Sequence, residues 1–269
     1  MIPKIIHYCW ISDSKNYHLP EIVQECINSW KKILPDYEIK EWNLNNFDIN
    51  KNDYIREAYK AKKYAFVSDY IRLYVLYNYG GIYMDTDVKA LKSFNDLLRN
   101  KAFMGFESID RIATCIIGSE KENKIIKEML NLYDNKHFIK ENGEYDLIPN
   151  TVLVKSILKK YDIIYNNVLQ RKEVITIYPI EYFCPLNGMT GEMNITSNSY
   201  AIHLFNGSWL SQKEKTRLIL YRKYYSKLKV VCPQNIADLV AKGLATYSIE
   251  GYKGVVYRFY KRFFLETKN

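Results

Sequence analysis

Hydrophobic and polar positions follow two different periods along most of the chain. Short apolar runs predict buried strands, and apolar residues spaced by three or four predict amphipathic helices. The predicted strands are 4–11, 37–42, 82–84, 103–106, 112–117, 174–178, 182–184 and 200–204, and the predicted helices are 20–33, 53–63, 64–79, 122–132 and 151–161. Because strands and helices alternate through the first half, we expect an α/β fold with a mainly parallel sheet covered by helices.

The pattern changes near Gln212. From residue 213 onward it is helical, with predicted helices at 213–229, 235–247 and 254–265. The charge changes at the same place: residues 1–209 hold 26 Lys/Arg and 26 Asp/Glu, whereas residues 210–269 hold 13 against 4, so the last segment carries the whole net charge of +9. We therefore predict a catalytic domain over 1–211 and a basic helical segment over 212–269.

Two interpretations of this basic segment stay open. A helix with cationic and aromatic or aliphatic residues suits an anionic membrane surface. The same composition suits helices that pack on the domain while Lys and Arg side chains extend outward. Nucleic-acid binding is disfavoured, because no recognised nucleic-acid-binding fold or base-stacking motif accompanies the charge.

The cysteines bear on the compartment. The five cysteines, Cys9, Cys26, Cys115, Cys184 and Cys232, show no close pair of the zinc-knuckle or redox type. We expect free thiols in a reducing compartment, which indicates the cytoplasm, with a peripheral position at the inner face of the cell membrane as an option. No apolar run approaches the roughly 20 residues of a membrane span. The run from Ile5 to Ile11 is predicted to be a strand and not a signal peptide.

The chemistry centres on the stretch Gly80 to Val88, which reads GGIYMDTDV. A short apolar strand runs directly into Asp85 and Asp87, and ligands of open α/β sheets bind at the carboxyl ends of strands. Two carboxylates that face one small volume are costly without a cation. Mg²⁺ and Mn²⁺ prefer such oxygen ligands, with phosphate completing the shell. The turn therefore predicts a divalent cation that holds a phosphate.

The preceding helix places a second charged pair near this turn. Asp69 and Arg72 are three residues apart, so they share one face of a helix that is otherwise apolar and aromatic. A surface ion pair is the ordinary interpretation, but the apolar neighbours indicate burial. Asp69 could then accept hydrogen bonds from sugar hydroxyls while Arg72 orients it or contacts phosphate.

Four segments together resemble a known family: IPKIIHYCW, FVSDYIRLYVLY, GGIYMDTDV and AIHLFNGSW. They are similar to glycosyltransferase family 32, whose sugar-binding region contains an Asp-X-Asp motif. This family includes capsular-polysaccharide glycosyltransferases and a group of mannosyltransferases, and the clostridial glucosylating toxins look like distant relatives. The resemblance covers roughly residues 2–210.

The resemblance implies a GT-A-like fold, a Rossmann-related mixed sheet flanked by helices. It also implies a retaining hexosyltransferase that needs Mn²⁺ or Mg²⁺ and a nucleotide-sugar donor, with a UDP-sugar favoured over a GDP-sugar. The residues that match the family's catalytic positions are Asp69, Arg72, Asp85 and Asp87. The implied metal ligands are Asp85, Asp87 and His203, and the implied donor-binding residues are Trp10, Tyr83, Asp85, Asn206, Ser208 and Trp209.

The predicted reaction is sugar transfer to a lipid-linked saccharide acceptor. The predicted process is bacterial surface-polysaccharide synthesis. A glycosidase needs two carboxyl groups across the scissile bond, whereas this pair is suited to a cation. Two alternatives stay open: a metal-dependent nucleotidyltransferase or phosphohydrolase that uses the same Asp pair, and a non-catalytic saccharide- or membrane-binding protein.

Overall fold

The structure is a computed structural model that describes residues 1–14, 17–207 and 210–260. The chain forms two compact units. The first contains residues 1–186 and 194–206, and the second contains residues 187–193 and everything from Gly207 onward. Each unit is described by itself.

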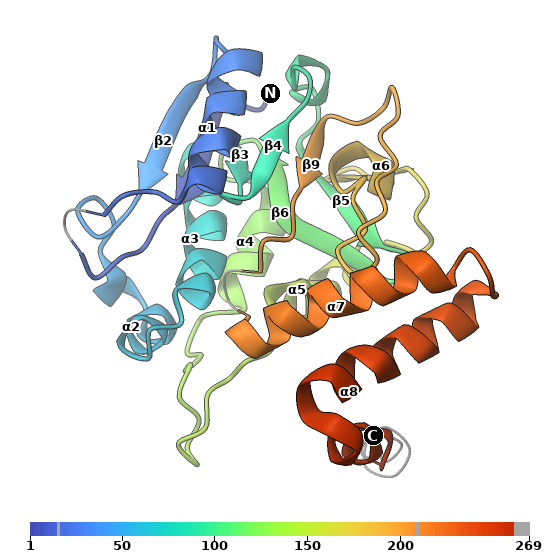
Figure 1. Cartoon of the computed structure of the whole chain (residues 1–269). Coiled ribbons are helices and arrows are strands. Elements are labelled where there is room, and N and C mark those ends of the chain that lie inside the picture. The colour runs from blue at the N-terminus through green and yellow to red at the C-terminus, as the bar shows by residue number, and fades with distance from the viewer. Residues whose placement is uncertain (15–16, 208–209, 261–269) are drawn as a thin grey trace. The chain divides into compact units, whose positions relative to one another are not determined.

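The first unit is built on a seven-stranded sheet with the order β2-β1-β3-β6-β5-β8-β7 (Figure 1). The strands are β1 Ile5–Cys9, β2 Glu38–Trp42, β3 Gly81–Met84, β5 Ala102–Ser108, β6 Arg111–Ser119, β7 Gln170–Arg171 and β8 Thr176–Tyr178. The pairs β1–β2, β1–β3 and β5–β8 are parallel, whereas β3–β6, β5–β6 and β7–β8 are antiparallel. The sheet is therefore mixed.

Helices cover both faces of this sheet. They are α1 Glu21–Ile33, α2 Asp53–Lys60, α3 Tyr64–Tyr79, α4 Lys124–Asn131, α5 Asn150–Lys160 and α6 Ile180–Phe183, with short 3₁₀ turns at Ile49–Lys51 and Asn95–Leu97. The helices α2, α3, α4 and α5 share one core cluster with Tyr83 of β3. The helices α1 and α6 share a second cluster with Ile82 and Met84 of the same strand. Successive side chains of β3 therefore pack into cores on opposite faces of the sheet. The predicted α/β class is confirmed.

A small second sheet lies beside the first. The strands β4 Val88–Ala90 and β9 Ala201–His203 run antiparallel, with Val88 opposite His203. The side-chain Nε1 of Trp30 on α1 donates a hydrogen bond of 2.7 Å to the carbonyl of Val88, which anchors β4. This ladder brings His203, more than a hundred residues away in sequence, next to Asp87.

Three expectations need correction. The sheet is not mainly parallel, because β5 and β6 form a hairpin through the two-residue turn at Ile109 and Asp110. Residues 182–184, predicted as a strand, instead end the short helix α6: residues 182 and 183 are its last two residues and Cys184 is its C-cap. The helix begins after Pro179, whose fixed φ suits a helix start. The strands β4 and β7 were not predicted, because three- and two-residue strands carry no usable periodicity.

The second unit is a pair of helices, α7 Gln212–Leu228 and α8 Gln234–Tyr260. A capping box at Ser211 and Glu214 begins α7. Gly251 has φ of 65° and interrupts α8, near the break predicted between 247 and 254. Ala237, Ala241 and Ala245 are fully buried in the cluster that joins the two helices. Among the described residues, no helix has both the length and the apolar character needed to cross a membrane.

Candidate functional site

The predicted site residues meet at one edge of the main sheet. β1 and β3 are parallel, with His7 opposite Tyr83, so both strands end at the same edge. Trp10 follows β1 and Asp85 follows β3 at this edge. The carboxyl ends of parallel strands are where α/β folds place their ligands.

Backbone hydrogen bonds shape the turn that carries the two aspartates. The amide of Asp85 donates to the carbonyl oxygen of Cys115 on β6 at 2.8 Å, and the amide of Val88 donates to the carbonyl of Asp85 at 3.0 Å. The turn folds Asp85 and Asp87 toward the same volume. One ligand atom each from Asp85, Asp87 and His203 lies within 4.8 Å of the other two, so the three predicted metal ligands are brought together.

Arg72 ties the helix α3 to this turn. Its Nη2 lies 2.9 Å from Oδ1 of Asp69 and 3.2 Å from Oδ1 of Asp85, and Nη1 donates to the carbonyl of Thr114 at 2.6 Å. The residue is only 4% exposed. A guanidinium held in this way has one orientation, and it bridges the two carboxylates that the sequence placed 16 residues apart.

Asp87 is held from the other side by the segment that follows β9. Nε2 of His203 lies 3.4 Å from Oδ1 of Asp87, and the backbone amide of Asn206 donates to Oδ2 at 2.9 Å. The amide of Leu204 donates to the backbone carbonyl of Asp87 at 2.9 Å. Asn206 therefore contributes its backbone, which side-chain patterns in a sequence do not reveal.

Burial and charge act differently on the three carboxyl groups. Burial raises the pKa of Asp69 to about 6, with Arg72 opposing and Asp85 adding to the rise. Burial also raises the pKa of Asp85, again against the opposing charge of Arg72. Burial would raise the pKa of Asp87 as well, but the hydrogen bonds from His203 and from the Asn206 amide outweigh it and hold that pKa below its usual range.

These groups fit a divalent cation. Three carboxylates and one guanidinium leave a charge of about two negative units when His203 is neutral, and such an excess is costly in a buried site. Burial lowers the pKa of His203, but the Cys115 and Asp87 side chains outweigh it, so the pKa lies above its usual value and an incoming ion would displace a proton. Nε2 of His203 faces Asp87 and would be the coordinating nitrogen. Carboxylate oxygens are the ligands that Mg²⁺ and Mn²⁺ prefer.

His7 and the glycine pair Gly80 and Gly81 set the start of β3. Nε2 of His7 lies 2.8 Å from the carbonyl of Gly80, and Nε1 of Trp42 donates to Nδ1 of His7 at 3.0 Å. A Cβ added to Gly81, whose φ is 105°, would lie 2.9 Å from Nε2 of His7. The glycine pair thus allows the backbone to pass close over the imidazole, and this fixes where the Asp turn begins.

The remaining predicted residues differ in what the structure says of them. Trp10 is partly exposed beside the site, and its buried Nε1 has no hydrogen-bond partner among the described residues. Tyr83 is 1% exposed, and its ring lies 4.8 Å from the guanidinium carbon of Arg72, so its observed contact supports Arg72. A contact between Tyr83 and a donor stays a prediction. Ser208 and Trp209 lie outside the described residues.

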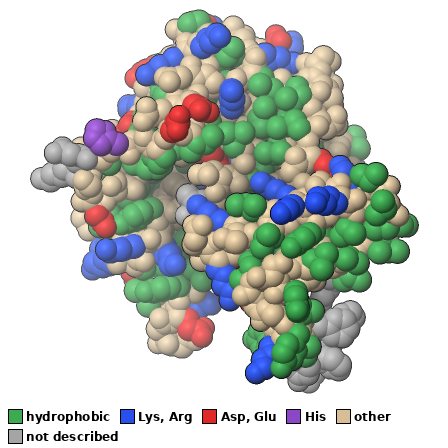
Figure 2. Space-filling view, in the orientation of Figure 1, with side chains coloured by type: hydrophobic (Ala, Val, Ile, Leu, Met, Phe, Trp, Pro, Cys, Tyr) green, Lys and Arg blue, Asp and Glu red, His purple; other side chains and the backbone are tan. Residues whose placement is uncertain are grey.

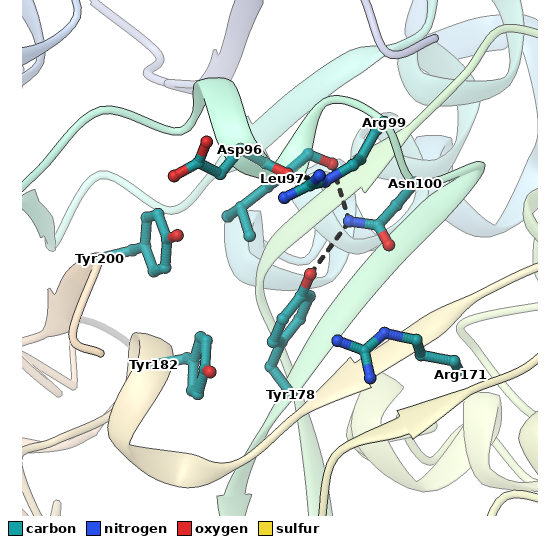
Figure 3. A pocket seen from close by; sticks show the side chains of 8 residues that line it. All are labelled: Asp96, Leu97, Arg99, Asn100, Arg171, Tyr178, Tyr182 and Tyr200. Atoms are coloured by element: carbon teal, nitrogen blue, oxygen red, sulfur yellow. Dashed lines mark hydrogen bonds between the residues drawn. The ribbon is translucent and has the colours of Figure 1, made fainter. Parts of the chain in front are cut away.

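A separate cavity of about 570 Å³ lies away from the Asp turn (Figure 3). In Figure 3, Tyr178, Tyr182 and Tyr200 line it with Arg99 and Arg171, and Asn100 donates to the hydroxyl of Tyr178 at 3.1 Å. In the β4–β9 ladder His203 lies at the Asp87 end and Ala201 at the other end, and Tyr200 continues beyond Ala201. None of the predicted site residues that the structure describes lines this cavity.

Comparison with known proteins agrees with this geometry. Residues 20–104 match the family model described as the glycosyltransferase sugar-binding region containing a DXD motif. The matched segment contains Asp69, Arg72, Asp85 and Asp87, the four predicted catalytic residues. The predicted resemblance is therefore confirmed for this region, and the family implies a divalent metal and a nucleotide-sugar donor.

Individual relatives are also glycosyltransferases by name. The chain is 28% identical over 145 residues to inositol phosphoceramide mannosyltransferase 3 of Schizosaccharomyces pombe, a match that covers 51% of this chain and 40% of the relative. It is 24% identical over 238 residues to an uncharacterized glycosyltransferase of Acanthamoeba polyphaga mimivirus, covering 83% of this chain and 90% of that protein. A solved structure titled PaToxG Glycosyltransferase aligns with a TM-score of 0.45 and 24% identity, over 59% of this chain and 68% of that one. The chain spans less than half the length of the first curated relatives it matches.

Proposed function

We propose that the protein transfers a hexose from a nucleotide-diphosphate sugar to a saccharide acceptor, with retention of the anomeric configuration. The observation that carries the proposal is the convergence of Asp85, Asp87 and His203 within 4.8 Å at the end of β3. The family match at residues 20–104 supports sugar transfer as the reaction. The donor is a UDP-sugar, and the activating ion is Mn²⁺ or Mg²⁺.

In this proposal Asp85, Asp87 and His203 hold the ion. When bound, a divalent cation neutralises charge that develops on the leaving diphosphate as the glycosidic bond breaks. The Asn206 amide keeps Asp87 oriented toward the site. Trp10, beside the same edge, stacks on the nucleobase.

Asp69 contacts the sugar. Arg72 holds its Oδ1 at 2.9 Å, so the carboxylate cannot rotate freely and presents its remaining oxygen lone pairs to sugar hydroxyls. The acceptor hydroxyl attacks the sugar from the face that the diphosphate leaves, which accounts for retention. The chain's residues act here by binding and orienting both substrates, which is a large part of the barrier reduction in group transfer.

The test is turnover of the Asp87→Ala variant. With UDP- and GDP-sugars in the presence of Mn²⁺, the wild-type chain should release nucleoside diphosphate, and the variant should release it about 10³-fold more slowly, the loss typical of one strong electrostatic contact. Asp110→Asn, on the exposed β5–β6 turn, is the matched control and should keep the wild-type rate. Near-normal rates for Asp87→Ala with a chelator present would contradict the metal mechanism.

Product analysis separates this reaction from its alternatives. A glycosyltransferase yields transferred sugar and nucleoside diphosphate. A nucleotidyltransferase or phosphohydrolase with the same Asp pair would yield nucleoside monophosphate or free phosphate. A non-catalytic saccharide-binding protein would yield neither, and no nucleotide would stabilise it in a metal-dependent way.

We further propose that the acceptor is lipid-linked and that the reaction belongs to bacterial surface-polysaccharide synthesis. In this proposal the second unit binds the anionic cytoplasmic face of the cell membrane. One stripe of α8 supports membrane contact, because its large apolar side chains are 39–61% exposed at helical spacing: Ile236, Leu239, Val240, Leu244 and Tyr247. Figure 2 shows hydrophobic side chains beside Lys and Arg over α7 and α8. The relative from Schizosaccharomyces pombe is named as an inositol phosphoceramide mannosyltransferase, and a phosphoceramide is a lipid.

Vesicle flotation tests this second proposal on the full chain. The wild type should float with vesicles that contain anionic lipid and should stay behind with neutral ones. The double variant Leu239→Ser with Tyr247→Ser should float several-fold less. Ile109→Ser, an equally exposed apolar residue on the first unit, is the control. Equal flotation of the wild type and the double variant would contradict membrane binding through α8.

A further inference from the structure

Two thiols lie against the same histidine that faces the Asp pair. Sγ of Cys115 on β6 and Sγ of Cys184, directly after α6, are 3.9 Å apart, and one ligand atom each from Cys115, Cys184 and His203 lies within 4.8 Å of the others. Both cysteines are at most 3% exposed. Three elements that are distant in sequence thus bring two sulfurs and one imidazole into a single small volume.

The spacing of these groups suits a tetrahedral thiophilic ion. With Zn–S bonds of about 2.3 Å and tetrahedral angles, two coordinating sulfurs are about 3.8 Å apart. The observed 3.9 Å is close to this separation. His203 also offers a buried Nδ1 that has no hydrogen-bond partner among the described residues, so one ring nitrogen is free to coordinate.

Charge points to the same kind of ion. Two thiolates, one neutral imidazole and one divalent cation sum to zero, which is the state that a buried apolar site tolerates best. Binding releases the two thiol protons to solvent. Sulfur ligands select Zn²⁺ and other soft ions, whereas the neighbouring carboxylates of Asp85 and Asp87 select Mg²⁺ and Mn²⁺.

We propose that Cys115, Cys184 and His203 form a second cation site, which takes a thiophilic divalent ion such as Zn²⁺ and shares His203 with the Asp85–Asp87 turn. An ion that coordinates Nδ1 leaves the proton of His203 on Nε2, which faces Asp87 and then cannot coordinate an ion held there. As a consequence that rests on the proposed function, Zn²⁺ should then inhibit the turnover that Mn²⁺ supports. Binding itself does not depend on the proposed function.

The experiment is a Co²⁺ titration of the reduced, metal-free full chain, followed by absorption spectroscopy. Co²⁺ bound to thiolates gives a ligand-to-metal charge-transfer band in the near ultraviolet, which carboxylates and imidazole do not give. We expect this band to saturate at one equivalent of Co²⁺ and to be abolished by added Zn²⁺. Cys184→Ser should lose the band or bind Co²⁺ at least tenfold more weakly. Cys232→Ser, a cysteine of the second unit, is the matched control and should behave as the wild type.

Two results would overturn the proposal: a wild-type chain without the thiolate band, or a Cys184→Ser chain that keeps the band at the same affinity. Circular dichroism shows whether the serine variants fold, and the wild-type titration decides the question even if they do not. Asp87→Asn should keep the thiolate band while it loses Mn²⁺-dependent turnover. If the wild type shows the thiolate band with Co²⁺ but no Mn²⁺-dependent turnover when Co²⁺ and Zn²⁺ are absent, the result counts against the proposed function and not against this site.

Discussion

The site at the carboxyl end of β3 and the helix pair α7–α8 differ in where their charged residues lie. At the edge of β3, Arg72 is 4% exposed and lies between two carboxylates at 2.9 and 3.2 Å. In the helix pair, the buried seam consists of alanines with Tyr221 and Tyr225, and charged and apolar side chains share the surface. Buried charges with fixed partners indicate chemistry at one point, whereas a basic surface with an exposed apolar stripe suits a broad, less specific contact. The predictions below test this difference, from the largest effect to the smallest.

The largest effect on stability should come from removing the buried guanidinium of Arg72. Arg72→Leu leaves Asp69 and Asp85, both only partly exposed, beside each other without the guanidinium that bridges them. Loss of one partner of a buried ion pair typically costs about 3–5 kcal/mol. Urea unfolding should therefore show a fall of this size in the free energy of unfolding. Lys213→Leu, an exposed cation on α7, is the comparison and should change it by less than about 1 kcal/mol. Equal effects of the two substitutions would remove the contrast between the regions.

The buried side chain of His7, on β1, should make the free energy of unfolding depend on pH. Burial lowers the pKa of His7 to about 4 from the ordinary 6.5, with the charge of Lys40 adding to the fall and the hydrogen bond to the Gly80 carbonyl opposing it. Between about pH 4 and 6.5 the unfolded chain therefore binds more protons at this residue than the folded chain does. His7 should lower the free energy of unfolding by about 3 kcal/mol as the pH drops from 6.5 toward 4, whereas the raised pKa of Asp69 acts in the opposite direction between about pH 6 and 4.

Urea unfolding at a series of pH values checks this expectation. The difference in free energy of unfolding between the wild type and His7→Asn should shrink by about 3 kcal/mol between pH 6.5 and 4, although the variant is less stable at neutral pH. His18→Asn, at an exposed histidine, is the control. A difference between the wild type and His7→Asn that stays constant with pH would contradict this role of His7.

Most helices of the first unit could be predicted from the sequence. So could the grouping of four charged residues near the end of β3: Asp69, Arg72, Asp85 and Asp87. Regular apolar spacing and a strand that ends in Asp-X-Asp are local patterns, so they are visible in one sequence. The β4–β9 ladder was missed because its partners are about 110 residues apart and only three residues long. The Asn206 amide and the Thr114 and Cys115 carbonyls were also missed, since backbone groups are the same in every residue.

Within the helix pair, overpacking should be the most damaging change. Ala241 is fully buried between α7 and α8, and Ala241→Leu inserts extra carbon atoms where no space is left. We expect a loss of about 1–3 kcal/mol in the stability of this unit. Thermal unfolding followed by circular dichroism measures it, with Leu239→Ala, on the exposed stripe, as the control. If Ala241→Leu unfolds at the wild-type temperature, the seam is looser than described.

The smallest predicted effect concerns the start of α7. Ser211 accepts a hydrogen bond from the Glu214 amide, and the Glu214 carboxylate accepts from the Ser211 amide. Ser211→Ala should cost about 1 kcal/mol of helix stability. Ser211→Asp retains a capping side chain and should recover most of the loss in a urea titration. If the aspartate variant is no more stable than the alanine variant, the cap does not limit stability here.

Anomalous diffraction from crystals soaked with Mn²⁺ and a nucleoside diphosphate would locate the ion that the two aspartates are proposed to hold. We expect one manganese peak between the carboxylates of Asp85 and Asp87, within coordination distance of both and of a diphosphate oxygen. An ordered nucleotide with no manganese between these side chains, which then point to solvent, would contradict it.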